Sequence, residues 1–186
     1  MNWLNTILIL AAAFLAVFCE AAFQGLRRMV GAQLDLLPAL MVYASLSAGL
    51  PAVALLAVFG GLCFDSLSAN PLGVSVLPLF AIGVVLYTKR ELILRDEPFA
   101  QLVLGFAVSA AAPLLTLLVL LTTGHKPLLG WGTLWQWVVM SVGGAAATPL
   151  WFALFAWLRG ALVHSAATQS SFRPDREIRR GRRGMK

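Results

Sequence analysis

Hydrophobic and polar positions in this chain separate on the scale of whole helices rather than single turns. Charged side chains are absent from five long stretches, 1–19, 36–64, 66–88, 98–124 and 127–158. Each stretch approaches or exceeds the roughly 20 apolar residues that a helix needs to cross about 30 Å of hydrocarbon. The pattern therefore predicts an all-α integral membrane protein.

The stretch 36–64 does not fit a single standard span. Its 29 residues would form a helix of about 43 Å, which is long for one span and short for two full ones. Small residues and a glycine interrupt it at 45–50, and Pro51 is suited to the first turn of a new helix. We predict two short helices here, at about 36–49 and 51–68.

The other predicted helices are about Asn5–Phe23, Leu72–Thr88, Phe99–Thr123 and Leu134–Leu158. The first is interpreted as a retained helix and not as a cleaved signal peptide, because no Lys or Arg precedes it and no small-residue cleavage site follows it. The predicted fold is a compact bundle of six transmembrane helices over residues 1–160, followed by a basic tail at 161–186. A five-span alternative fuses 36–68 into one tilted helix.

The distribution of charge predicts the orientation of the bundle. The chain has 14 Lys and Arg against 8 Asp and Glu, and the net positive charge belongs to the segment from Arg159 onward. Six spans with the N-terminus inside put eleven basic residues on the cytoplasmic side and three outside. Five spans give thirteen and one, so charge alone favours five and helix length favours six. Both arrangements place the C-terminus in the cytoplasm.

The end of the tail concentrates its positive charge. Its basic residues are Arg173, Arg176, Arg179, Arg180, Arg182, Arg183 and Lys186. Two acidic residues, two glycines and a proline interrupt them, a composition that predicts a disordered segment. Near an anionic leaflet each Lys or Arg contributes on the order of 1 kcal/mol, so the cluster is a candidate contact for anionic lipids or for an acidic partner. The simpler interpretation is that it only fixes orientation.

Residue types that support catalysis are missing from the apolar framework. There is no phosphate-binding loop, no HExxH and no GxSxG pattern. His125 and His164 stand alone, and Cys19 and Cys63 lack the spacing of a metal cage. We therefore predict no enzymatic activity, no cofactor, no metal site and no nucleic-acid binding.

Two carboxylates lie within or beside apolar runs, where an ionised group costs several kcal/mol unless it is paired or faces water. They are Glu20 and Asp65, and in the six-span arrangement both lie near the outer ends of their helices, close to the level of Arg27 and Arg28. For Glu20 we favour a structural pair or an interfacial position. For Asp65 we favour contact with a partner, because small residues and a turn surround it.

The surroundings of Asp65 carry a recognisable spacing. Gly61 precedes it by four residues, and Leu72 and Gly73 follow after the Asn70-Pro71 turn. This region resembles the rod-shape-determining MreD family, whose third and fourth helices are joined by a G-x-x-x-D segment and a later Leu-Gly. Weaker likenesses are Asp35-Leu36-Leu37, Leu40–Tyr43 and Ala147–Leu150, while Leu34 stands where the family usually has proline.

The resemblance implies a non-enzymatic, multi-pass component of the bacterial inner membrane that belongs to the cell-elongation machinery and regulates cell shape. It implies partners: an MreC-like periplasmic coiled-coil protein, the actin-like filament MreB and peptidoglycan synthases. It makes Gly61, Asp65, Leu72 and Gly73 the candidate partner-contact residues.

An alternative function is a membrane substrate-binding subunit of a vitamin or metal importer. Such a subunit is expected to have a set of aromatic and polar residues that converge on a pocket near the outer surface. Trp131, Trp135 and Trp137 are candidates for this set. Interface anchoring is the commoner use of such tryptophans.

Small residues spaced four apart mark three helix faces that permit close packing. The pairs are Ala57/Gly61, Gly105/Ser109 and Gly144/Thr148. Most such pairs pack a bundle internally, and an intermolecular role is the alternative.

Overall fold

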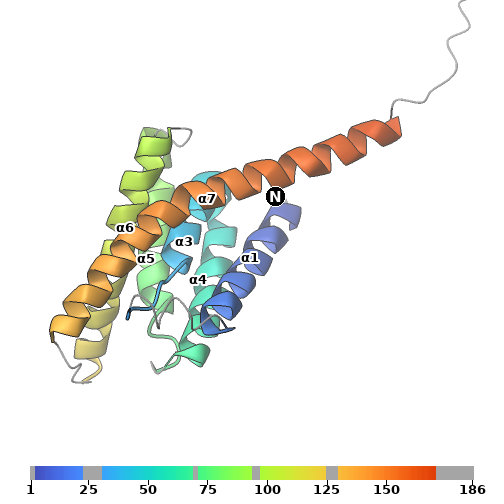
Figure 1. Ribbon diagram of the computed structural model, residues 1–186. Coiled ribbons are helices and arrows are strands. Elements are labelled where there is room, and N and C mark those ends of the chain that lie inside the picture. Colours follow the sequence, from blue (N-terminus) through green and yellow to red (C-terminus); the bar gives the residue numbers. More distant parts are fainter. Residues whose placement is uncertain (1–2, 23–30, 69–70, 94–96, 125–129, 171–186) are drawn as a thin grey trace, which may run out of the picture. The chain divides into compact units, whose positions relative to one another are not determined.

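The computed structural model describes residues 3–22, 31–68, 71–93, 97–124 and 130–170. Over these residues the chain is helical and contains no strand (Figure 1). The elements are α1 (Trp3–Ala22), α3 (Leu37–Ser47), α4 (Leu50–Leu67), α5 (Val76–Lys89), the 3-10 turn η1 (Arg90–Leu92), α6 (Pro98–Thr122) and α7 (Trp131–Ser170). The chain divides into two compact units, Met1–Phe152 and Ala153–Lys186, and the packing described below belongs to the first.

Four helices are long and apolar enough to cross a membrane: α1, α4, α6 and the Trp131–Ala161 part of α7. The predicted all-helical class is confirmed for the described residues, and these four helices have the length and composition that a membrane span requires. The helices α3 and α5 have 11 and 14 residues, lengths of about 16 and 21 Å, which fall short of about 30 Å of hydrocarbon.

The stretch from 36 to 68 forms two helices that fold back on each other. Ala48 and Gly49 are extended and separate α3 from α4. Pro51 follows in the first turn of α4, where its missing N–H is tolerated. A Cβ atom at Gly60 would lie 3.2 Å from the side chain of Leu37, so the start of α3 packs beside the later part of α4. The prediction of two helices is confirmed, and the single fused helix of the five-span alternative is wrong.

Two predicted helix bounds are wrong. The helix expected from Leu72 begins at Val76, because 72–75 form a turn. The last helix was expected to end at Leu158, with a tail from 161, but α7 continues to Ser170. Residues 159–170 contain alanines, a leucine and a glutamine, which favour helix, and only one glycine.

The short helix α3 lies at the centre of the first unit. It contacts α1, α4, α5 and α6, and ten of its residues, Leu37 through Leu46, are buried. A helix that is apolar on every side is typical of such an enclosed position. Its Tyr43 ring meets the ring of Phe152 edge to face at 5.1 Å between centroids.

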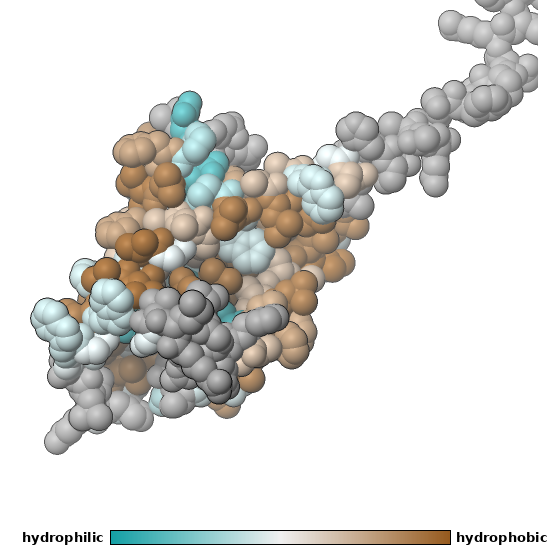
Figure 2. All heavy atoms as spheres, in the orientation of Figure 1, coloured by the Kyte–Doolittle hydropathy of each residue, from teal (hydrophilic) through white to brown (hydrophobic). Residues whose placement is uncertain are grey.

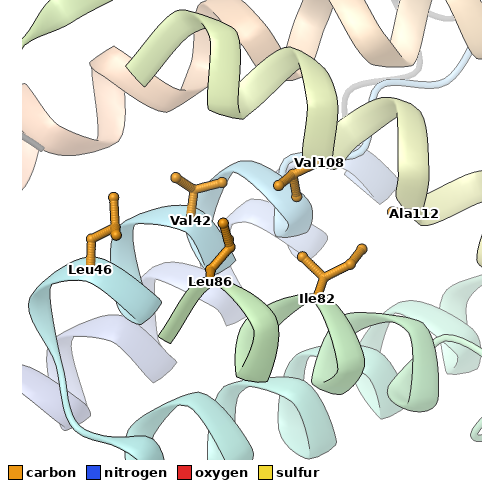
Figure 3. Packing of buried hydrophobic residues seen from close by; sticks show 6 residues of the cluster. All are labelled: Val42, Leu46, Ile82, Leu86, Val108 and Ala112. Atoms are coloured by element: carbon orange, nitrogen blue, oxygen red, sulfur yellow. The ribbon is translucent and has the colours of Figure 1, made fainter. Parts of the chain in front are cut away.

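One part of the core joins three helices through pairs of residues spaced four apart (Figure 3). The pairs are Val42 and Leu46 on α3, Ile82 and Leu86 on α5, and Val108 and Ala112 on α6. Residues four apart share one helix face, so each helix presents a single apolar face to this cluster.

Large apolar side chains are also exposed on the outer faces of the helices. Examples are Phe14 and Phe18 on α1, Leu55 on α4, and Leu114 and Leu118 on α6. Brown, hydrophobic residues cover much of the visible surface in Figure 2. An apolar exterior over an apolar core is the arrangement expected of helices that face lipid.

Candidate functional site

The carboxylate of Asp65 holds the connection between α4 and α5. Its Oδ2 accepts hydrogen bonds from the backbone N–H groups of Gly73 (2.8 Å) and Ser75 (3.1 Å). Its Oδ1 accepts the hydroxyl hydrogen of Ser75 at 2.5 Å. The side chain is 2% exposed. Asp65 therefore satisfies three donors of the turn, and its role in this fold is internal.

Two glycines of the same motif make this turn possible. Gly73 has φ +91°, a conformation that side chains rarely adopt, and its N–H points to Asp65. At Gly61 a Cβ atom would lie 2.9 Å from the Cα of Val76. Absence of a side chain at Gly61 thus lets the start of α5 approach α4 closely enough for Ser75 to reach Asp65.

Leu72 differs from the other three motif residues. It is 71% exposed at the tip of the turn, so burial within the chain contributes little at this position. The structure therefore brings Gly61, Asp65 and Gly73 together as the support of the turn and leaves Leu72 on the surface.

Ser75 belongs to this site and was missed by sequence reasoning. It is the residue before the first turn of α5, and serine at that position is a common helix-start signal. Because the predicted helix begins at Leu72, this signal at Ser75 was not used. Its backbone and side chain supply two of the three hydrogen bonds to Asp65.

Two further carboxyl groups lie where the chain enters α3. Oε1 of Glu20 accepts the N–H of Leu36 at 2.7 Å, and Oδ1 of Asp35 accepts the N–H of Leu37 at 3.0 Å. These bonds satisfy backbone donors that a helix start leaves without partners. Glu20 therefore has a structural contact, and the partner that the structure shows is a backbone N–H. Arg27 and Arg28, the arginines considered as its ion-pair partners, lie outside the described residues.

Asp35 lies outside the helices, in the 31–36 segment, and is 9% exposed. Burial raises the pKa of its carboxyl group from 3.8 to about 7. The hydrogen bond from Leu37 opposes this rise in pKa, and the charge of Asp65 adds to it. Asp35 is therefore a carboxyl group that changes its charge near neutral pH.

The 31–36 segment is also fixed to the beginning of α7. Gln136 forms two hydrogen bonds with the backbone of Gln33: its Nε2 donates to the carbonyl at 2.6 Å, and its Oε1 accepts the N–H at 3.0 Å. Leu34 packs on Gly143, where a Cβ atom would collide with its side chain. Leu34 thus has a packing role here.

A cavity of about 190 Å³ lies beside Asp35. Most of its walls are apolar and include Phe64, Pro78 and Pro113, and Asp35, Ser75 and Thr116 add polar side chains. Trp131, Trp135 and Trp137 do not line it. Trp131 and Trp135 are exposed, and the indole N–H of Trp137 donates to the carbonyl of Ala110 at 2.8 Å. The convergence of tryptophans on a pocket, expected for the importer subunit, is not seen among the described residues.

The small-residue faces of α6 and α7 pack against each other. A Cβ atom at Gly105 would collide with Thr148, and one at Gly144 would collide with Ser109. The hydroxyl of Thr148 donates to the carbonyl of its own helix at Gly144 (2.8 Å). These two faces therefore serve packing within the first unit, as Gly61 of the third face does.

Several other predictions are not addressed by these contacts. The tail residues Arg173, Arg176, Arg179, Arg180, Arg182, Arg183 and Lys186 lie outside the described residues. Within the described part of the chain, no group of three His, Cys, Asp or Glu side chains is arranged to hold a metal ion.

Comparison of the chain with models of protein families, with curated proteins and with solved structures gives no match.

Proposed function

We propose that this chain is a non-enzymatic inner-membrane component of the bacterial cell-elongation machinery, which links an MreC-like periplasmic protein to MreB-like filaments and peptidoglycan synthases. The observation that carries the proposal is that the four residues of the family-like motif have different positions in the structure. Gly61, Asp65 and Gly73 support a turn, and Leu72 is 71% exposed at its tip. An exposed leucine on a fixed turn is suited to contact with an apolar surface of another protein.

The proposal assigns Leu72 the direct contact and Asp65 the support. This assignment replaces the expectation that the Asp65 carboxylate itself meets the partner, because that side chain is 2% exposed and accepts three internal hydrogen bonds. Loss of either residue then weakens the same association for different reasons.

Co-purification with the MreC-like protein of the same organism tests this function. The chain and its partner are co-expressed, the membranes are solubilised in mild detergent, and the partner recovered with the tagged chain is quantified. We expect Leu72→Ser to reduce that recovery at least fivefold while the amount of the chain in the membrane stays normal. Leu92→Ser is the matched control, because Leu92 is a similarly exposed leucine (80%, against 71% for Leu72) on η1, away from the turn. Equal recovery with Leu72→Ser and Leu92→Ser would contradict the proposal.

The proposed topology has six passes, with both termini in the cytoplasm. Four span-length helices and the hairpin of α3 and α4 support it. The enclosed α3 and the partly exposed α5 then cross as short helices. Single cysteines at positions 28 and 126 should react with an impermeant thiol reagent from outside, and one at position 89 should not. Absence of labelling at position 28 would contradict the six-pass topology.

The basic tail is proposed to lie against anionic lipids. A synthetic peptide of residues 173–186 should bind vesicles containing phosphatidylglycerol at low salt and dissociate as ionic strength rises. A chain truncated before Arg173 should still insert with normal orientation, since Lys89, Arg90 and Arg159 remain. Salt-insensitive binding by the peptide would exclude an electrostatic role for the tail.

A second candidate function is the substrate-binding subunit of a vitamin or metal importer, and the cavity beside Asp35 favours it. This function requires an ATP-hydrolysing partner. Recovery of such a subunit with the tagged chain, in place of the coiled-coil protein, would favour the importer over the elongation machinery.

A further inference from the structure

The cavity beside Asp35 has the chemistry of a binding site, independently of the proposed function. Its volume of about 190 Å³ exceeds the 150 Å³ or so of an engineered apolar cavity that binds benzene. A group of about that size, with an apolar body, fits its walls of Phe64, Pro78 and Pro113.

The polar groups that line this cavity are acceptors. The hydroxyl of Ser75 has donated its hydrogen to Asp65, and the hydroxyl of Thr116 has donated its hydrogen to the carbonyl of Ala112. Asp35 uses Oδ1 to accept the N–H of Leu37, and its Oδ2 accepts no hydrogen bond within the described part of the chain. Asp35 is nine-tenths buried and lines the cavity, so this oxygen is an acceptor that a ligand in the cavity can reach.

A ligand that satisfies these acceptors must bring hydrogen-bond donors. A primary ammonium group has three donors and no acceptor, and it also neutralises a carboxylate. Among the residues that the structure describes, the titratable groups that interact electrostatically with Asp35 are Glu20 on α1 and Asp65 on α4. Both are acidic, and no basic side chain among the described residues forms an ion pair with any of the three carboxyl groups.

We propose that this cavity binds a small amphipathic primary amine, with the ammonium group on Asp35 and the apolar body between α5 and α6. An aminophospholipid carries the same ammonium group, but it would bring its phosphate to apolar walls with one carboxyl group, that of Asp35, and with the carboxyl groups of Glu20 and Asp65 nearby. The site therefore takes a free amine rather than a lipid headgroup.

Phenethylamine is a suitable probe, because it joins one aromatic ring to one ammonium group. Binding to the full chain is measured by calorimetry in nanodiscs of phosphatidylglycerol, which contains no amine. Phenethyl alcohol, which has the same shape without the charge, is the ligand control. We expect saturable binding of the amine and at least tenfold weaker binding of the alcohol; equal binding of the two would overturn the proposal.

The pH dependence of binding provides a second readout. The pKa of Asp35 is raised to about 7, whereas an alkyl ammonium loses its proton only near pH 10. The Kd for the amine should therefore fall about tenfold between pH 6 and pH 8, as the Asp35 carboxyl ionises. A Kd that does not change over this range would contradict ion pairing with Asp35.

Three variants locate the site. Asp35→Asn keeps an acceptor for the N–H of Leu37 and should abolish amine binding. Ala112→Met, which fills the cavity and keeps the carboxyl group, should also abolish it, and it tests the site if Asp35→Asn fails to fold. Glu91→Gln, an exposed carboxylate on η1, should bind as the original chain does. Unchanged binding by either cavity variant would overturn the proposal. Displacement of the probe by phosphatidylethanolamine in the disc would overturn the assignment to a free amine.

Discussion

Two short connections in this fold are closed by different means. Between α3 and α4 the chain turns at Ala48 and Gly49, where no side chain caps the new helix and backbone carbonyls receive the first N–H groups. Between α4 and α5 the chain turns through residues 68–75, and the buried Asp65 receives three hydrogen bonds. The first turn thus depends on backbone geometry, and the second depends on one charged side chain held out of water.

This difference predicts how each connection responds to substitution. A turn closed by its backbone tolerates any residue whose φ and ψ fit. A turn closed by a buried carboxylate loses several hydrogen bonds when that one side chain is removed, and the donors left behind are buried without partners.

The largest expected effect is therefore that of Asp65→Ala. It leaves two N–H groups and one hydroxyl without their acceptor, and we expect a loss of about 3–5 kcal/mol in the free energy of unfolding. Asp65→Asn keeps one oxygen and should lose less. Reversible unfolding of the reconstituted protein measures both. A loss below about 1 kcal/mol for Asp65→Ala would show that the turn does not depend on the carboxylate.

A second prediction concerns Asp35, the buried carboxyl group at the entrance to α3. Its pKa in the folded chain, about 7, lies above the unfolded value of 3.8. Its contribution to stability is therefore fully present below pH 3.8 and is lost as pH rises toward 7. Asp35→Asn should flatten the fall in thermal stability between pH 5 and pH 8, while Glu91→Gln should not. An identical fall in the original chain and in Asp35→Asn would contradict this assignment.

The glycines of the two connections provide a matched and smaller comparison. Gly73 has φ +91° and Gly49 has φ −84°. Gly73→Ala should cost about 1–2 kcal/mol in the free energy of unfolding, since alanine is strained at positive φ. Gly49→Ala should change it by less than about 0.5 kcal/mol, because its Cβ atom would make only ordinary contact with Pro51 at 3.5 Å. Equal losses in the free energy of unfolding for Gly73→Ala and Gly49→Ala would contradict the proposed difference between the two turns.

The smallest expected change in stability is that of Leu72→Ser. The side chain is 71% exposed, so its loss should change the free energy of unfolding by less than about 0.5 kcal/mol. The same denaturation experiment measures it. A loss as large as that of Asp65→Ala would mean that Leu72 supports the fold and is not a surface residue free for a partner.

The sequence was informative where backbone chemistry decides the structure. Gly49 and Pro51 predicted the break between two helices. The charge-free stretches predicted the helical membrane class. The spacing of Gly61, Asp65 and Gly73 also marked the site. The periodicity of the sequence does not indicate that the Asp65 carboxylate points inward. Its position depends on a hydrogen bond from Ser75, ten residues later, and Ser75 lies within reach because α5 packs on Gly61.

The cavity beside Asp35 was not predictable for a similar reason. Its walls come from the 31–36 segment and from α4, α5, α6 and α7, and no local pattern relates positions so far apart in the chain. The alanines that follow Arg159 were a weak indication that α7 continues to Ser170. The change from apolar to charged composition after Leu158 favoured an earlier end.

Amide hydrogen exchange in the reconstituted protein tests the central claim most directly. The N–H groups of Gly73 and Ser75 donate to Asp65, and those of Ala52 and Val53 donate to the carbonyl of Gly49. Asp65→Asn should accelerate exchange at Gly73 and Ser75 at least tenfold and leave Ala52 and Val53 unchanged. Exchange at Gly73 and Ser75 that is equally fast in the original chain and in Asp65→Asn would show that the buried carboxylate does not hold this turn.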